Sequence, residues 1–251
     1  MEPTSLLTPR AKKSEIASDE VETAAQRERL SLRIVTAADK EQPNYRDLLA
    51  EILKVQKVLA WRPGMTAREV AKGFLGTTWS QSELHALIAE GGWLTVAIDR
   101  ETGQLQGYGL VSLIRHLPPG DFVPAPDSPL RTRDEILDDA RFMYGYQIAV
   151  RPDRSLRRLS IGPAIFAAGQ TEGCRRCINV VACAMEAPWC NKSSLAFLTA
   201  MRRKRIGTIY DPAGPPLIAQ PVVWACLVTW PLRELNSSPE TWTQPGLKAQ
   251  S

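Results

Sequence analysis

The first strong pattern of apolar positions in the chain is helical. Leu48, Ile52, Val55 and Leu59 recur at spacings of four, three and four residues, which predicts an amphipathic helix. Two capping boxes of the form Ser/Thr-x-x-Glu follow, at residues 66–69 and 80–83, and each predicts the start of a short helix. Ahead of these helices, residues 32–36 form a short candidate strand.

From residue 93 onward the pattern changes to that of strands. Segments 93–99 and 105–116 are apolar and β-rich, and the turn residues 100–103 between them predict a hairpin. Further strands are expected at 144–150, 177–184, 208–210 and 222–230, with helices at about 134–140, 160–172 and 193–205. This order predicts a mixed α/β sheet with helices on both faces.

Two segments between these elements carry their own expectations. Segment 117–133 holds five prolines and is too long for a plain connection, which predicts a functional or disordered loop. Residues 202–205 are all basic. We expect them in the last turn of the helix 193–205, where positive charge suits the helix dipole.

Composition then narrows the class of protein. Of the 251 residues, 44% are hydrophobic and 23% are charged, which is enough to bury a core and excludes wholesale disorder. Residues 1–30 and 236–251 are polar and predict flexible tails around one domain at 31–235. A net charge of +4 is too weak to favour nucleic acid as a partner, and no apolar run is long enough for a membrane span. With no export signal and five cysteines, we expect reduced thiols in a cytoplasmic protein.

The most informative stretch lies where a strand runs into a helix. The strand ends at Val150, and a loop follows that carries arginines at positions 151, 154, 157 and 158. The next helix begins with the small residues Ser160, Gly162 and Ala164. Free backbone N–H groups, the helix dipole and neighbouring guanidinium groups together predict a pyrophosphate site. A solvated basic loop before an ordinary helix fits the same spacing.

These residues resemble the pyrophosphate motif of the GNAT superfamily of acyl-CoA N-acyltransferases. The family motif is Gln or Arg, x, x, Gly, x, Gly or Ala, after a strand that ends in Val-x-Pro. The chain reads Val150-Arg151-Pro152 and then, over residues 157–162, Arg-Arg-Leu-Ser-Ile-Gly, with Ser160 where glycine is usual. The asparagine that opens the helix after the fifth strand of the family is matched by Asn191, with Ser194 three residues later.

The resemblance implies a GNAT-like α/β fold. Its sheet is mixed and mostly antiparallel, with about six to seven strands, helices on both faces and a splay between strands four and five. Pantetheine of acetyl-CoA, or of another acyl-CoA, would enter that splay as the co-substrate. The residues implied to bind it are Ile148, Ala149 and Val150 on the strand, Arg157, Arg158, Leu159, Ser160, Ile161 and Gly162 at the pyrophosphate, and Asn191 and Ser194 on the pantetheine arm.

The chemistry implied is direct attack of a free amine on the thioester. An alkyl amine has a pKa of about 10, so a base or an acidifying pocket must remove its proton. The tyrosine that many relatives place seven residues after the asparagine, as an acid for the leaving thiolate, is Leu198 here. Solvent, Tyr210 or Cys190 can take that role instead.

Two residues are candidates for catalysis, Glu186 and Tyr146. The strand face expected to bear Tyr144, Tyr146 and Ile148 carries no glutamate, and Glu186 is the nearest carboxylate in sequence. The alternatives are a plain loop carboxylate at Glu186, half-buried sheet aromatics at Tyr144 and Tyr146, and a base reached through water.

The function expected is therefore transfer of an acetyl or other acyl group from acyl-CoA to a primary amine on a small molecule or a protein. The alternative is a catalytically inactive acyl-CoA-binding module with a regulatory or interaction role. No metal is expected, because the chain has a single C-x-x-C pair, at Cys174 and Cys177. No membrane or nucleic-acid partner is expected, and a homodimer is compatible with the family.

Overall fold

The computed structural model describes residues 29–152 and 161–229. These residues form one eight-stranded sheet, flanked by helices. The strands are β1 (Leu30–Val35), β2 (Trp93–Asp99), β3 (Leu105–Leu113), β4 (Asp121–Pro124), β5 (Phe142–Val150), β6 (Asn179–Ala187), β7 (Arg203–Asp211) and β8 (Val222–Thr229). The helices are α2 (Tyr45–Leu59), α3 (Ala67–Ala71), α4 (Gln81–Ala89), α5 (Asp134–Leu137), α6 (Ile161–Arg175) and α7 (Lys192–Ala200).

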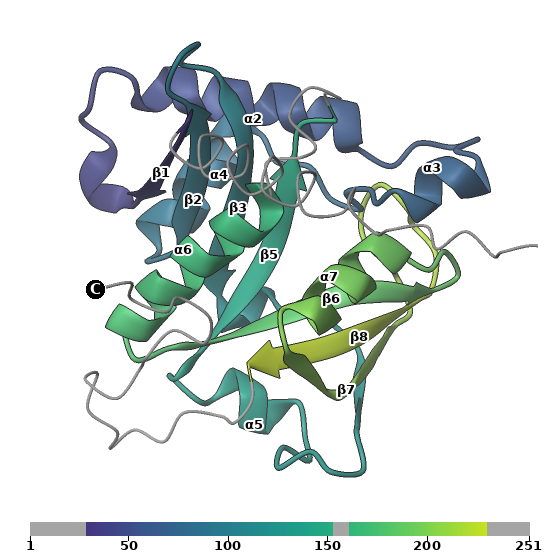
Figure 1. Cartoon of the computed structure of the whole chain (residues 1–251). Helices are drawn as coiled ribbons and strands as arrows, with labels where there is room; N and C mark the ends of the chain where they lie inside the picture. The colour runs from purple at the N-terminus through teal and green to yellow at the C-terminus, as the bar shows by residue number, and fades with distance from the viewer. Residues whose placement is uncertain (1–28, 153–160, 230–251) are drawn as a thin grey trace, which may run out of the picture.

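The sheet is mixed and mostly antiparallel, as predicted. Its strand order is β1-β2-β3-β5-β6-β8-β7-β4, and β5 with β6 is the parallel pair. Helix α6 connects these two strands and packs against β1, β2, β3 and β5. Helices α6 and α7 cover one face, and α2 and α4 lie behind the sheet on the other (Figure 1). Both predicted capping boxes are present, at the starts of α3 and α4.

The main core lies between the sheet and α2 with α4. Apolar side chains of the two helices, including Leu49, Ile52 and Leu84, pack on the buried strand residues Val96 and Tyr108. A second cluster fills the same side of the sheet's other half, around Tyr144, Val181 and Ile206.

The splay lies between β5 and β6. These strands pair only over Phe142–Gly145 and Asn179–Ala182, and then residues 146–150 and 183–187 continue apart (Figure 1). Strand β5 stays paired with β3, and β6 stays paired with β8. These are the strands that the sequence analysis counts as four and five, because it does not predict the short strand β4 that precedes them.

Strand β4 corrects the expectation for segment 117–133. Its four residues, Asp121–Pro124, pair antiparallel with β7, so that β4 is the edge strand of the sheet. Gly207 of β7 makes room for it, since a Cβ at that position would lie 2.5 Å from the ring of Phe122. The segment is therefore partly ordered as the last strand of the sheet, which makes eight strands instead of six to seven.

The prediction that the basic residues 202–205 form the last turn of a helix is also wrong. Helix α7 ends at Ala200, Arg202 adopts a positive φ of 56°, and β7 begins at Arg203. Residues 203–205 are therefore strand residues, which means that their charge does not complement a helix end. The reason is local: Arg203 is buried and Lys204 exposed, a strand's alternation that the continuous charge hides.

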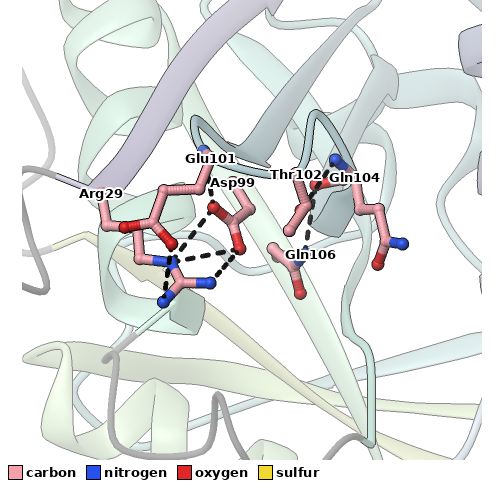
Figure 2. A network of polar contacts seen from close by, with 6 residues as sticks. All are labelled: Arg29, Asp99, Glu101, Thr102, Gln104 and Gln106. Carbon is pink, nitrogen blue, oxygen red and sulfur yellow. Dashed lines mark hydrogen bonds and ion pairs between the residues drawn. The ribbon is translucent and has the colours of Figure 1, made fainter.

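The hairpin between β2 and β3 is fixed to the chain entering β1. The guanidinium of Arg29 donates to both carboxylate oxygens of Asp99, at 2.8–3.2 Å, and also pairs with Glu101 (Figure 2). Asp99 in addition accepts the backbone N–H of Glu101. This network lies at the β1 edge of the sheet, and β4 forms the other edge.

The predicted tails at 1–30 and 236–251 fall almost wholly outside the described residues, and the domain limits 31–235 stay a prediction. Within the described parts of the chain, none of the helices is both long and apolar enough to span a membrane.

Candidate functional site

A cavity of about 440 Å³ opens between the diverging strands β5 and β6. It reaches both faces of the sheet, because its lining comes from the α6 and α7 side and also from the segment that precedes α4. The lining includes residues 144–150 of β5, residues 182–185 of β6, residues 72–77, and Gly162, Phe166, Asn191, Ser194 and Phe197.

The geometry of β5 at the cavity is set by a β-bulge. Leu110 of β3 pairs with Gln147 while Val111 pairs with Gly145, which leaves Tyr146 as the extra residue. An extra residue reverses the alternation of side chains beyond it. Ile148 therefore lies on the α6 face, and the expectation that it shares a face with Tyr144 and Tyr146 is wrong. The sequence carries no signal for a bulge here.

Tyr146 lies in an aromatic group beside the cavity. Its ring centroid is 4.7 Å from that of Trp79, edge to face, and 4.8 Å from that of Tyr144. Burial raises the pKa of Tyr146 to about 12. The hydroxyl therefore stays protonated at neutral pH, which makes it a hydrogen-bond donor and a poor base.

Gln147 connects β5 to the segment that covers the cavity from the α2 side. Its Oε1 accepts the hydroxyl of Tyr108 at 2.7 Å, and its Nε2 donates to the carbonyl of Thr77 at 2.6 Å. The side chain is 8% exposed; its bond to Tyr108 is buried and its bond to Thr77 is partly buried. They hold the wall formed by residues 74–77 against β5.

Asn191 begins α7 at the cavity wall. Its Oδ1 accepts the backbone N–H of Ser194 at 3.1 Å, and its Nδ2 lies 3.5 Å from the carbonyl of Phe74. The buried side chain is thus held by the helix it caps and by the segment before α4. Both Asn191 and Ser194 line the cavity.

The other residues implied to bind acyl-CoA divide into three groups. Ile148, Ala149, Val150 and Gly162 line the cavity. Ile161 is buried in an apolar cluster with Ile165 and Leu30 instead. Arg157, Arg158, Leu159 and Ser160 lie outside the described residues.

Glu186 lies in an ion pair on β6 rather than in the cavity lining. Its carboxylate accepts hydrogen bonds from both terminal nitrogens of Arg205, at 2.7 and 2.5 Å. It is also the extra residue of a bulge, since Met185 pairs with Trp224 and Ala187 with Val223. Tyr210 and Cys190 do not belong to the described lining, whereas Leu198 does.

The charges that line the cavity are cationic. Its described lining contains Lys72 and Arg203 and no aspartate or glutamate. Sequence reasoning missed Arg203, because it assigned residues 202–205 to a solvated helix end. No alternation of apolar residues around Arg203 signals its burial, because β7 carries a bulge between Arg205 and Gly207.

Comparisons of the fold come from solved structures, since neither a protein-family model nor a curated protein matches the sequence. The structure is similar to the ribosomal-protein-S18-alanine N-acetyltransferase of Escherichia coli, with a TM-score of 0.50, 10% identity, and coverage of 83% of this chain and 99% of that one. It is also similar to a protein of Acinetobacter baylyi assigned to the acetyltransferases, with a TM-score of 0.50, 14% identity, and coverage of 83% and 98%. The chain has the fold of the GNAT acyl-CoA N-acyltransferases.

Proposed function

We propose that the protein is an N-acyltransferase that moves an acetyl or other acyl group from acyl-CoA to a primary amine. The observation that carries this proposal is the cavity between β5 and β6. Because the strands separate after Gly145 and Ala182, backbone groups of residues 146–150 on the cavity side have no strand partner in β6. Those groups can bond a pantetheine arm as an added strand would.

The ends of two helices complete the proposed acyl-CoA site. Gly162 lies in the first turn of α6, where free N–H groups and the helix dipole favour a pyrophosphate. Arg157, Arg158, Leu159 and Ser160 belong to the same proposed pyrophosphate site, and Ile161 is the first residue of α6. Asn191 and Ser194, at the start of α7, contact the pantetheine arm from the other side.

The transfer itself needs a neutral amine and a donor for the leaving group. The amine nitrogen bonds to the thioester carbon, the C–S bond breaks, and the CoA thiolate takes up a proton. In a cavity whose charged lining residues are cations, the charged form of the amine is disfavoured, so its pKa falls and it loses a proton without a carboxylate. The protonated hydroxyl of Tyr146 supports the sulfur as its negative charge develops.

Glu186 is a general base in this proposal only if it leaves Arg205. Glu186→Gln separates the possibilities: an unchanged rate with an unchanged pH profile assigns deprotonation to the cationic cavity, and a large loss of turnover assigns it to the carboxylate.

The acceptor in this proposal is a small amine or a protein amino group. The proposal also includes a homodimer and a cytoplasmic location.

The first test is calorimetric titration of the protein with acetyl-CoA, using variants at Gly162. A Cβ there would lie 3.6 Å from the Phe197 ring, an ordinary van der Waals contact, so the position has room for a Cβ atom. We expect Gly162→Asp to weaken binding about tenfold or more relative to Gly162→Asn, which matches it in size but carries no charge. Equal affinity of the two variants would place the pyrophosphate elsewhere.

The alternative, an acyl-CoA-binding module without catalysis, predicts the same binding. It is separated by thiol release from acetyl-CoA in the presence of a panel of amines. Release that depends on an amine and falls in Tyr146→Phe supports the enzyme. Binding without release for any amine of the panel supports the module.

A further inference from the structure

One end of the cavity is formed by a buried arginine, Arg203. It is the first residue of β7 and only 6% exposed, and it belongs to the cavity lining. Its Nη1 donates to the carbonyl of Val180 and lies 3.5 Å from that of Leu227. Its guanidinium carbon lies 4.9 Å from the centre of the Phe166 ring, on α6.

This guanidinium has no counter-charge among residues 29–152 and 161–229. No aspartate or glutamate of that part of the chain pairs with it, and its Nε is buried without a hydrogen-bond partner there. Burial lowers the pKa of Arg203 to about 9, so the group still carries its charge at neutral pH. A buried charge without a partner is destabilising, and an anion that enters the cavity relieves it.

The location of Arg203 identifies which part of a bound ligand it meets. Val180, whose carbonyl it contacts, precedes by two residues the last pair of β5 and β6, at Gly145 and Ala182. Two strand residues span about 7 Å. Arg203 therefore lies beside the paired ladder at the closed end of the splay, on the opposite side of the point where the strands part from residues 146–150.

A phosphate of CoA does not fit this position. The proposed pyrophosphate site is at Gly162, in the first turn of α6, whereas Arg203 contacts Phe166 and lines the cavity together with Gly169 and Gln170. Helix residues four to eight positions apart are separated by about 6 to 12 Å along the axis. The anion at Arg203 must belong to the other end of the ligand, the acyl group.

We propose that the acyl group accepted by this cavity ends in a carboxylate, as in the CoA thioester of a short dicarboxylic acid, and that Arg203 binds that carboxylate. The inference rests on the proposed acyl-CoA site. An acetyl group is too short to carry a charge to Arg203, whereas a chain of about four carbons crosses the two-residue interval. This carboxylate takes no part in the reaction, so the C–N bond that forms and the C–S bond that breaks are those of the acetyl transfer described above.

The test compares binding of succinyl-CoA, acetyl-CoA and butyryl-CoA to the full chain by calorimetry. Butyryl-CoA matches the length of the succinyl group without its charge. We expect the wild-type protein to bind succinyl-CoA about tenfold or more tightly than butyryl-CoA, the effect of one charge-assisted pair of hydrogen bonds. Arg203→Met should abolish this preference, and Arg203→Lys should keep part of it.

Lys72 provides the matched control, since it is the other cation of the described lining but is exposed, on the segment that precedes α4. Lys72→Met should leave the ratio of succinyl-CoA to butyryl-CoA affinity unchanged. Loss of the preference in that variant rather than in Arg203→Met would overturn the assignment to Arg203.

The outcomes also separate this inference from the function on which it rests. Binding of acetyl-CoA together with equal affinities for succinyl-CoA and butyryl-CoA overturns the inference and leaves the proposed function standing. Binding of none of the three thioesters by the folded protein overturns both. The wild-type comparison decides the matter even if Arg203→Met does not fold.

Discussion

At the scale of single residues, the site depends on buried polar groups that satisfy one another. Gln147 is the clearest case, because it bridges the hydroxyl of Tyr108 and the carbonyl of Thr77 across the cavity wall. A buried polar group that loses its partner is destabilised by the full cost of its desolvation. The attachment of the wall to β5 therefore depends on this amide side chain.

Gln147→Leu should lower the free energy of unfolding by about 1–3 kcal/mol, because it leaves the Tyr108 hydroxyl without an acceptor. The measurement is urea denaturation of the wild-type protein, both single variants and the double variant Tyr108→Phe/Gln147→Leu. The double variant should lose less stability than the sum of the two singles, since it removes donor and acceptor together. Strict additivity would show that the bridge contributes nothing.

Sequence reasoning reached some of these residues and not others, and the difference has a physical cause. Asn191, Ser194 and Gly162 match short family motifs at helix starts, and the structure places all three in the cavity lining. Arg203 was placed in a helix, because four consecutive basic residues match the charge preference of a helix end. Its burial against Phe166 and Val180 is a tertiary fact that no local pattern encodes.

At the scale of elements, periodicity predicted most helices and strands, and the irregularities were missed. The bulge at Tyr146 turns Ile148 to the other face of the sheet, yet adds no residue type that stands out in the sequence. Strand β4 was missed for a related reason. Its four residues end in a proline, and only the edge of β7 and the space at Gly207 give them a partner.

The β2–β3 hairpin gives a prediction about pH. Hydrogen bonds from Arg29 lower the pKa of Asp99 to about 2, below the usual value of about 3.9 for an aspartate. A carboxyl whose pKa is lower in the folded state contributes stability above its unfolded pKa and loses it as the pH falls. Asp99→Asn should therefore be less stable than the wild-type protein at pH 5 to 8.

The difference in unfolding free energy between the two proteins should shrink as the pH falls from about 4 toward 2. Thermal unfolding followed across that interval measures it. Glu101→Gln is the control, because Glu101 is an exposed partner of the same arginine and should show a much smaller effect. A difference between wild type and Asp99→Asn that stays constant down to pH 2 would refute the linkage.

At the scale of the whole molecule, the sheet consists of two halves held together at a short junction. One half, β1-β2-β3-β5, is covered by α2, α4 and α6, and the other, β6-β8-β7-β4, is covered in part by α7. Only the four pairs between Phe142–Gly145 and Asn179–Ala182 join them as a ladder. The order of elements predicted a mixed sheet with helices on both faces, whereas the splay between its halves was implied by the resemblance to the GNAT superfamily.

A ligand in the splay should therefore contact both halves of the sheet and stabilise the folded protein. At a hundredfold excess over its dissociation constant, acetyl-CoA should raise the free energy of unfolding by about 2.7 kcal/mol. Hydrogen exchange should localise the effect to amides of residues 146–150 and 183–187 that face the splay, because these lack a strand partner there. Amides in the ladder between β7 and β8 are the internal control, since they are already paired along the whole of β7. Protection confined to one of the two splayed strands would mean that the ligand binds to one half of the sheet and does not enter between them.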